Sequence, residues 1–122
     1  MLRIFRKRGP GHLPTFLIIG AAKCGTTSLH YYLNLHPEIA ISWEKEIRFF
    51  NYDHRWNRGV RWYKRHFVGE AKAYGEASVG YTNHPAFTGV PERIHSVVPD
   101  VKLIYIVRDP IERTVSDYVH AY

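Results

Sequence analysis

The sequence of 122 residues has a single cysteine, a single methionine and no long apolar run. The lone Cys24 excludes a disulfide within the chain and a zinc site built from several thiolates. The longest apolar stretches, residues 16–19 and 104–107, have the length of strands, far short of the roughly 20 residues that cross a bilayer. We therefore expect no membrane span, no signal peptide and a cytoplasmic location.

Basic residues outnumber acidic ones, 17 to 11, but the excess is unevenly distributed. Four of the 17 lie within the first eight residues, which leaves 13 basic against 11 acidic residues in the rest of the chain. Residues 1–13 are expected to form a flexible basic tail, and residues 14–122 a single domain. Because that domain is nearly balanced in charge, we expect no nucleic-acid partner.

The hydrophobic pattern alternates between strand and helix along the domain. Apolar runs predict strands at 15–19, 39–41, 74–78 and 101–107, and helical spacing of apolar residues predicts helices at 26–35, 60–67, 90–98 and from 111 onward. The charged segment 44–50 has no clear periodicity and is interpreted as a loop. This alternation is typical of an α/β protein with a parallel β-sheet flanked by helices.

The segment Gly20-Ala-Ala-Lys-Cys-Gly-Thr-Thr-Ser28 connects the first predicted strand to the first predicted helix. Backbone N–H groups at a helix N-terminus, three hydroxyls and the charge of Lys23 favour a phosphate-like anion there. The two glycines have the spacing of a Walker A loop, but the lysine precedes the second glycine instead of following it. A P-loop nucleotide kinase is therefore an alternative, although the loop would lack that motif's main charged contact with the nucleotide phosphates. The other alternative is a tight turn with a helix N-cap that binds no ligand.

Four segments, taken in order, resemble sulfotransferases that use 3′-phosphoadenosine 5′-phosphosulfate (PAPS), in their carbohydrate-type and bacterial branch. The segments are Phe16–Leu29, Lys45-Glu-Ile-Arg-Phe-Phe50, Gly75-Glu-Ala-Ser78 with Tyr81, and Val107–Tyr118. The resemblance covers residues 14–122 and implies a P-loop-like parallel β-sheet, incomplete at its C-terminal end. It also implies transfer of a sulfuryl group from PAPS, without a metal, to a hydroxyl or amine of a small-molecule or carbohydrate acceptor.

The resemblance also implies which residues bind PAPS. Lys23 would contact the sulfonate and the bridging oxygen and stabilise charge on the departing phosphate. The 5′-phosphate would be held by the loop and the first turn of the helix, through Cys24, Gly25, Thr26, Thr27 and Ser28. Arg108 and Ser116 would bind the 3′-phosphate. By its spacing, Arg113 could take the place of Arg108. The alternative role of either arginine is a salt bridge to Asp109 or Asp117.

Sulfuryl transfer to a hydroxyl or amine requires a general base, and Glu46 is the candidate. Glu44 is its rival, and membership of a surface charge cluster is the alternative role for Glu46. The chain resembles only the N-terminal portion of such an enzyme, so we expect little activity from it alone and self-association through an exposed sheet edge. A non-catalytic nucleotide- or anion-binding fragment remains the alternative function.

Overall fold

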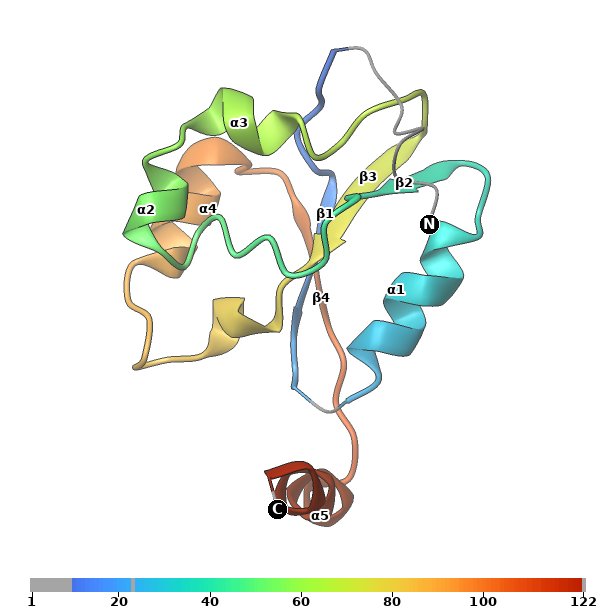
Figure 1. Ribbon diagram of the computed structural model, residues 1–122, viewed down its shortest axis with the longest axis vertical. Coiled ribbons are helices and arrows are strands. Elements are labelled where there is room, and N and C mark those ends of the chain that lie inside the picture. Colours follow the sequence, from blue (N-terminus) through green and yellow to red (C-terminus); the bar gives the residue numbers. More distant parts are fainter. Residues whose placement is uncertain (1–9, 23, 122) are drawn as a thin grey trace.

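A four-stranded parallel sheet forms the centre of the computed structural model, which describes residues 10–22 and 24–121 (Figure 1). The strands lie in the order β2-β3-β1-β4, with bounds Phe16–Gly20 for β1, Ile39–Ile41 for β2, Ala73–Ala77 for β3 and Lys102–Tyr105 for β4. All three strand pairings are parallel. The α/β class and all four predicted strands are thereby confirmed, whereas most of the expected basic tail lies outside the described residues.

Helices cover both faces of the sheet (Figure 1). On one face, α1 (Thr26–Asn34) packs Leu29 and Leu33 against a small cluster that includes Phe16 and Ile18. The opposite face carries α2 (Asp53–Trp56), α3 (Val60–Lys64) and α4 (Val90–Val97). Because successive strand residues point to opposite faces, the continuous apolar run of β1 supplies both cores.

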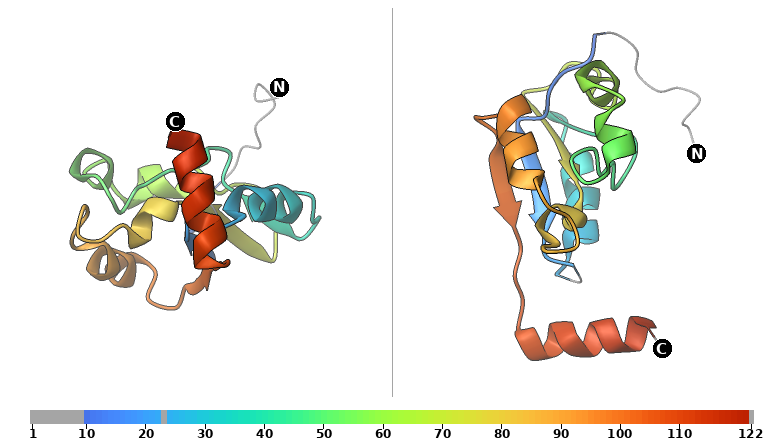
Figure 2. Two further views of the ribbon diagram at one scale, coloured as in Figure 1. Left: turned by 90° about the horizontal axis from the view of Figure 1, so that it is seen from below. Right: turned by 90° about the vertical axis from the view of Figure 1, so that its left-hand side faces the viewer.

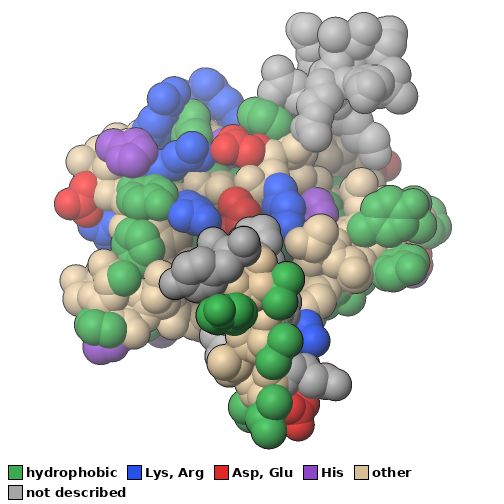
Figure 3. Space-filling model, turned by 60° about the horizontal axis from the view of Figure 1, so that its bottom comes forward, with side chains coloured by type: hydrophobic (Ala, Val, Ile, Leu, Met, Phe, Trp, Pro, Cys, Tyr) green, Lys and Arg blue, Asp and Glu red, His purple; other side chains and the backbone are tan. Residues whose placement is uncertain are grey.

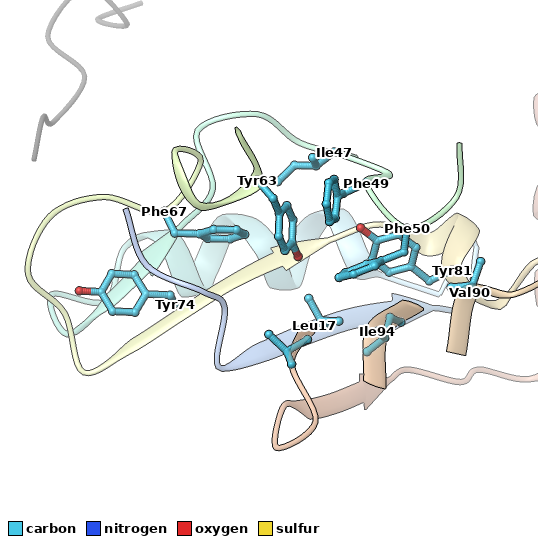
Figure 4. Close-up of a cluster of buried hydrophobic side chains, with 11 residues drawn as sticks. Leu17, Ile47, Phe49, Phe50, Tyr63, Phe67, Tyr74, Tyr81, Val90 and Ile94 are labelled. Atoms are coloured by element: carbon cyan, nitrogen blue, oxygen red, sulfur yellow. The ribbon is translucent and has the colours of Figure 1, made fainter. Parts of the chain in front are cut away.

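The larger core lies between β1, β3 and the helices of the second face and is rich in aromatic rings (Figure 4). Phe49 and Phe50, from the loop before α2, are fully buried there. Phe49 stacks on Tyr63 of α3 with ring centroids 4.3 Å apart, and Phe50 meets Tyr81 edge-on at 5.4 Å. Tyr81 belongs to a 3₁₀ helix, η2 (Val79–Thr82), which follows β3 directly. The two phenylalanines therefore anchor their loop in the core.

Several boundaries differ from the predicted ones. The strand predicted at 101–107 is shorter in the structure and runs from Lys102 to Tyr105, the residue paired with Gly20 at the end of β1. Helix α3 ends at Lys64, and its first residue Val60 is exposed where helical spacing had predicted a core position. Sequence patterning missed α2 and η2, since four residues are too few to show a helical period.

The last helix, α5 (Pro110–Ala121), stands apart from the other elements at the end of the molecule where β1 and β4 finish (Figure 2). Its described apolar side chains are exposed, whereas in β4 and the segment that joins it to α5 Ile104 and Ile106 are partly buried. The exposed apolar residues from β4 to α5 are Leu103, Tyr105, Val107, Ile111, Val115, Tyr118 and Val119. In the described order β4 is also an edge strand. None of the helices in the described ranges is long and apolar enough to cross a membrane.

Candidate active site

The pairing of β1 with β4 brings two of the sequence motifs to one edge of the sheet. The Ala21 N–H donates to the Ile106 carbonyl at 2.9 Å, and the Ile106 N–H donates to the Gly20 carbonyl at 2.8 Å. The phosphate-loop candidate therefore starts beside the segment that carries Arg108. This is the carboxyl edge of a parallel sheet, where ligands bind in open α/β folds.

The loop ends at Gly25, which caps α1 with a left-handed backbone (φ 88°). An added Cβ at Gly25 would meet no described atom within 4 Å, so backbone conformation rather than space favours glycine there. Cys24 and Thr26 are buried, whereas Thr27 and Ser28 are exposed at the first turn of the helix. Lys23 lies outside the described residues. The described part of the loop thus presents an open helix N-terminus with two accessible hydroxyls.

Gly20 is required for a different reason, because the chain is crowded where the loop leaves β1. A Cβ at this position would lie 2.8 Å from both the Thr82 hydroxyl and the Tyr105 ring. The same Thr82 hydroxyl donates to the Ile19 carbonyl at 2.9 Å. Glycine therefore allows η2 and β4 to close against the end of β1.

The Lys45-Glu46 segment is attached to both β3 and α1. Lys45 Nζ donates to Thr27 Oγ1 at 2.6 Å, and the Glu46 N–H donates to the Ala77 carbonyl at 3.1 Å. The first contact joins this segment to the phosphate-loop helix, and the second joins it to the carboxyl end of β3. The structure thereby brings Glu46 to the same edge of the sheet as Cys24–Ser28.

The Glu46 side chain is partly enclosed, with 24% of its surface exposed. Its Oε1 accepts from the Val79 N–H at 3.5 Å, and its Oε2 lies 3.5 Å from Arg48 Nε. Oε2 is buried and makes no hydrogen bond with any group among the described residues. Arg48 also donates to the Tyr52 hydroxyl at 2.9 Å, and this bond, more than the Glu46 charge, raises the pKa of the guanidinium. Glu46 therefore keeps one carboxylate oxygen with unused hydrogen-bonding capacity.

Glu44, the rival carboxylate, is held by other partners. Its Oε2 accepts from Arg55 Nη1 at 3.1 Å, and its Oε1 lies 3.3 Å from Nε2 of the buried His66. The His66 ring in turn stacks on Trp43 at 4.9 Å. Both oxygens of Glu44 therefore make side-chain hydrogen bonds, whereas Oε2 of Glu46 has only the ion pair with Arg48.

A second carboxylate, Glu76 of β3, is completely buried beneath the Glu46 segment. The Tyr63 hydroxyl donates to it, the Tyr81 hydroxyl donates at 2.8 Å and the Ser78 hydroxyl at 2.6 Å. Burial raises the pKa of Glu76 to about 7, although the three hydroxyl donors oppose the shift, and the nearby Glu46 charge adds to it. Burial also raises the pKa of Tyr63 and Tyr81, so both phenols stay protonated and donate.

A pocket of about 270 Å³ opens beside these groups. It is lined by the start of the phosphate loop, Arg48, η2 and the residues after it, and Tyr105. A larger, mainly apolar hollow of about 640 Å³ lies between α4 and β4 and contains none of the predicted site residues. At this end of the molecule basic and acidic side chains lie intermingled, and hydrophobic side chains line the projecting helix (Figure 3).

The residues predicted to bind a 3′-phosphate lie at and after the end of β4. Arg108 is exposed between β4 and α5, and Asp109 caps α5 by accepting from the Ile111 N–H at 2.9 Å. Ser116 falls within α5, but its side chain lies outside the described residues, as does that of Arg113. No cluster of three or more His, Cys, Asp or Glu side chains suited to a metal occurs in the described part of the chain.

Comparison with known proteins identifies the family. The sequence model of the sulfotransferase domain matches residues 13–122. The chain belongs to the sulfotransferase family. The crystal structure of a sulfotransferase from Alicyclobacillus acidocaldarius superimposes with a TM-score of 0.74 and 38% identity, over 89% of this chain and 50% of that chain. The resemblance and the fold inferred from four sequence segments are thereby confirmed.

Three relatives from the sulfotransferase family are 34–40% identical in sequence to this chain. The membrane-associated sulfotransferase kil1 of Dictyostelium discoideum is 40% identical over 111 residues, which are 87% of this chain and 22% of that protein. Human heparan sulfate glucosamine 3-O-sulfotransferase 5 is 37% identical over 109 residues, 87% of this chain and 30% of that protein. Mouse bifunctional heparan sulfate N-deacetylase/N-sulfotransferase 4 is 34% identical over 124 residues, 94% of this chain and 14% of that protein. The chain thus spans less than a third of each of these relatives.

Sequence reasoning assigned no catalytic or binding role to Lys45, Arg48 or Glu76, which the structure places around Glu46. A signal was present for Glu76, because a carboxylate within the apolar strand 73–77 has to be satisfied by buried donors. No comparable signal existed for Lys45, since its contact with Thr27 depends on how an irregular loop lies against α1.

Proposed function

We propose that this sulfotransferase domain serves to transfer a sulfuryl group from PAPS to a hydroxyl or amine of a carbohydrate, with little transfer by the 122-residue chain alone. The family assignment supports the reaction class, and the names of the heparan sulfate relatives support a carbohydrate acceptor. The observation that carries the proposal is the junction of two motifs: Lys45 joins the Glu46 segment to Thr27 at the N-terminus of α1. A carboxylate and an anion-binding helix end thus lie at one edge of the sheet.

The described residues at this edge fit a phosphosulfate donor. Gly25 leaves the first turn of α1 uncovered, and Thr27 and Ser28 offer exposed hydroxyls beside the helix N-terminus. Lys45, with its ammonium at Thr27, adds positive charge. PAPS supplies a sulfuryl group bonded to a phosphate that departs as an anion, and donors fixed around that phosphate stabilise the charge as it develops. We assign the same task to Lys23.

Glu46 acts on the acceptor. The Glu46 side chain is 24% exposed, and its Oε2, buried beside Arg48 at 3.5 Å, makes no hydrogen bond among the described residues, so the carboxylate has capacity to take up the proton of an incoming hydroxyl or amine. Removal of that proton leaves an electron pair on the acceptor oxygen or nitrogen, which bonds to sulfur while the bond from sulfur to the phosphate oxygen breaks. We assign recognition of the 3′-phosphate to Arg108 and Ser116 beyond β4.

A comparison of two nucleotides tests this function against the kinase alternative. Calorimetry of the chain with 3′-phosphoadenosine 5′-phosphate should show tighter binding than with ATP and Mg²⁺, because the lysine of the loop precedes the second glycine. Tighter binding of ATP and Mg²⁺ would contradict the proposal. Binding of the bisphosphate without transfer from PAPS to heparan-type acceptors, even with enzyme in excess, would instead favour a non-catalytic nucleotide-binding fragment.

A further inference from the structure

The end of β3 is connected to the backbone that carries Glu46 by several hydrogen bonds. The Ser78 hydroxyl, which donates to Glu76, also accepts from the Arg48 N–H at 3.1 Å. Together with the bonds from the Glu46 N–H to Ala77 and from Val79 to Glu46 Oε1, this fixes both sides of Ile47. The Ser78 N–H donates to the Ile18 carbonyl at 3.0 Å, so the same anchor reaches the strand that leads to the phosphate loop.

The anchored backbone has an unfavourable conformation. Glu46 and Arg48 both have positive φ, 57° and 55°, although neither is a glycine. Such left-handed residues cost free energy and persist only where the surrounding structure enforces them. Between them, Ile47 is fully buried in the aromatic core. This geometry turns Glu46 and Arg48 outward on either side of a buried residue, with their charged groups 3.5 Å apart.

The hydrogen bonds of Glu76 are those of a buried residue that holds surrounding groups in place. Three hydroxyls from three places, Tyr63 of α3, Tyr81 of η2 and Ser78 after β3, donate to its two oxygens. Since Ser78 donates its proton to Glu76, an oxygen lone pair of Ser78 is aimed at the Arg48 N–H. The rings of Tyr63 and Tyr81 pack on Phe49 and Phe50, which continue the same loop (Figure 4). Ring packing and hydroxyl orientation therefore act on the same backbone.

We propose that Glu76 is a positioning residue that, through the Ser78 hydroxyl, holds the Glu46 carboxylate in place to deprotonate the acceptor. The assignment rests on the proposed role of Glu46 as the general base. Glu76 is completely buried, so it acts through Ser78 and not on a substrate. All three of its hydroxyl partners donate to it, so its two oxygens act as acceptors.

Serine and glutamate variants test the link. Ser78→Ala removes the acceptor of the Arg48 N–H and leaves Tyr63 and Tyr81 bonded to Glu76, and Glu76→Gln replaces one acceptor oxygen by a donor. Ser42→Ala is the matched control, since Ser42 is also buried and its hydroxyl donates within the same loop, to the Glu44 carbonyl at 2.8 Å. Each variant is compared with wild type and Glu46→Gln for sulfation rate with enzyme in excess over PAPS, for affinity toward 3′-phosphoadenosine 5′-phosphate, and for hydrogen exchange of the Arg48 amide.

We expect Ser78→Ala and Glu76→Gln to slow transfer by about 10- to 100-fold, the range for a displaced catalytic group, with nucleotide affinity within about twofold of wild type. Arg48 amide exchange should accelerate at least about tenfold in Ser78→Ala and remain unchanged in Ser42→Ala. If Glu76→Gln fails to fold, Ser78→Ala carries the test by itself. An unchanged rate and unchanged Arg48 exchange in Ser78→Ala, in an enzyme that Glu46→Gln inactivates, would overturn the positioning role.

Failure of the underlying function gives a different pattern. If Glu46→Gln keeps the wild-type rate, Glu46 is not the base, and the proposed purpose of the anchor is overturned even if Arg48 exchange accelerates. If Ser78→Ala weakens nucleotide affinity as much as it slows transfer, Ser78 and Glu76 support the whole sheet edge, which also overturns a specific action on Glu46.

Discussion

Lys45 Nζ lies 2.6 Å from Thr27 Oγ1, which joins the loop of the proposed general base to the helix that starts at the phosphate loop. The two residues come from separate motifs, and the contact crosses from the irregular segment before α2 to the first turn of α1. A bound phosphosulfate would compete with Thr27 for the lysine ammonium.

Glu46→Gln should slow sulfuryl transfer by about 10²- to 10⁴-fold, the usual contribution of a general base, while nucleotide affinity stays near wild type. The amide preserves the shape of the side chain but cannot take up the proton. Rates are measured with PAPS and a heparan-type acceptor, with enzyme in excess so that slow transfer is visible. Glu44→Gln serves as the comparison, because both oxygens of Glu44 already have partners; a larger loss there would move the role of the base to Glu44.

Arg108→Ala should weaken PAPS by about 10- to 100-fold and leave adenosine 5′-phosphosulfate, which lacks the 3′-phosphate, almost unaffected. Lys23→Ala should impair both ligands, since both carry the phosphosulfate. Titration of the two variants with the two ligands gives four affinities. Equal losses for Arg108→Ala on both ligands would assign Arg108 to the fold and not to the 3′-phosphate.

The folded protein should lose stability as the pH rises from about 4.5 to about 7. The pKa of buried Glu76 is about 7 in the folded state against 4.5 for an ordinary glutamate, so the folded chain binds more protons in this window. The loss amounts to about 3 kcal/mol in the free energy of unfolding. The groups that face this carboxyl are Tyr63, Tyr81, Ser78 and the charge of Glu46.

The measurement compares urea unfolding of wild type and Glu76→Gln at several pH values. Taking the difference between the two proteins removes the opposite contribution of His30, whose pKa is lowered by burial and by Lys45. As the pH rises from about 4.5 to about 7, the unfolding free energy of wild type should fall relative to that of Glu76→Gln. A constant difference would show that Glu76 does not titrate there.

Gly75→Ala should destabilise the sheet by about 1–3 kcal/mol through overpacking. An added Cβ would overlap the ring of Phe16, the residue paired with Gly75 in the neighbouring strand. The double variant Phe16→Leu/Gly75→Ala should be less destabilised than the sum of the two single variants, because the smaller side chain makes room. Additive losses in denaturant unfolding would contradict steric coupling between the two positions.

The 122-residue chain should self-associate through β4 and α5 and show little transfer activity. The strand is an edge in the described sheet, and it exposes Leu103 and Tyr105, while the helix exposes Ile111, Val115, Tyr118 and Val119. Ile111→Lys/Val115→Lys should shift sedimentation velocity profiles toward monomer. Tyr32→Lys, an exposed position on α1, is the control. A wild-type chain that sediments as a monomer at all concentrations would contradict this prediction.

Sequence patterning predicted the strands well because each strand of a parallel sheet covered on both faces needs a continuous apolar run, as in residues 16–19. It predicted helix burial less well. Leu29 and Leu33 do pack on the sheet, whereas Tyr32 and Leu35, at equally plausible helical spacing, are exposed. Periodicity defines an apolar face but not whether another element covers all of it.

The motifs predicted which segments would form the site, but not how their side chains would be held. The double phenylalanine of residues 49–50 could be recognised without revealing that it packs on Tyr63 and Tyr81, whose hydroxyls bind Glu76. Likewise, the residue types around Glu46 do not indicate that Glu46 and Arg48, on either side of Ile47, both have positive φ. These features arise from contacts between separate elements, such as that of Arg48 with Ser78, 30 positions apart, which spacing arguments do not reach.

The anchoring of the Glu46 segment to β3 also has a dynamic consequence. Opening this segment would require releasing Ile47 from the core and breaking the bond between the Arg48 N–H and Ser78, whose own N–H is bonded to β1. Such an opening approaches the cost of unfolding the sheet itself, far above that of an ordinary surface loop. The Glu46 carboxylate is therefore held in a fixed position, and the segment does not open and close over the site. An acceptor must bring its hydroxyl or amine to Glu46.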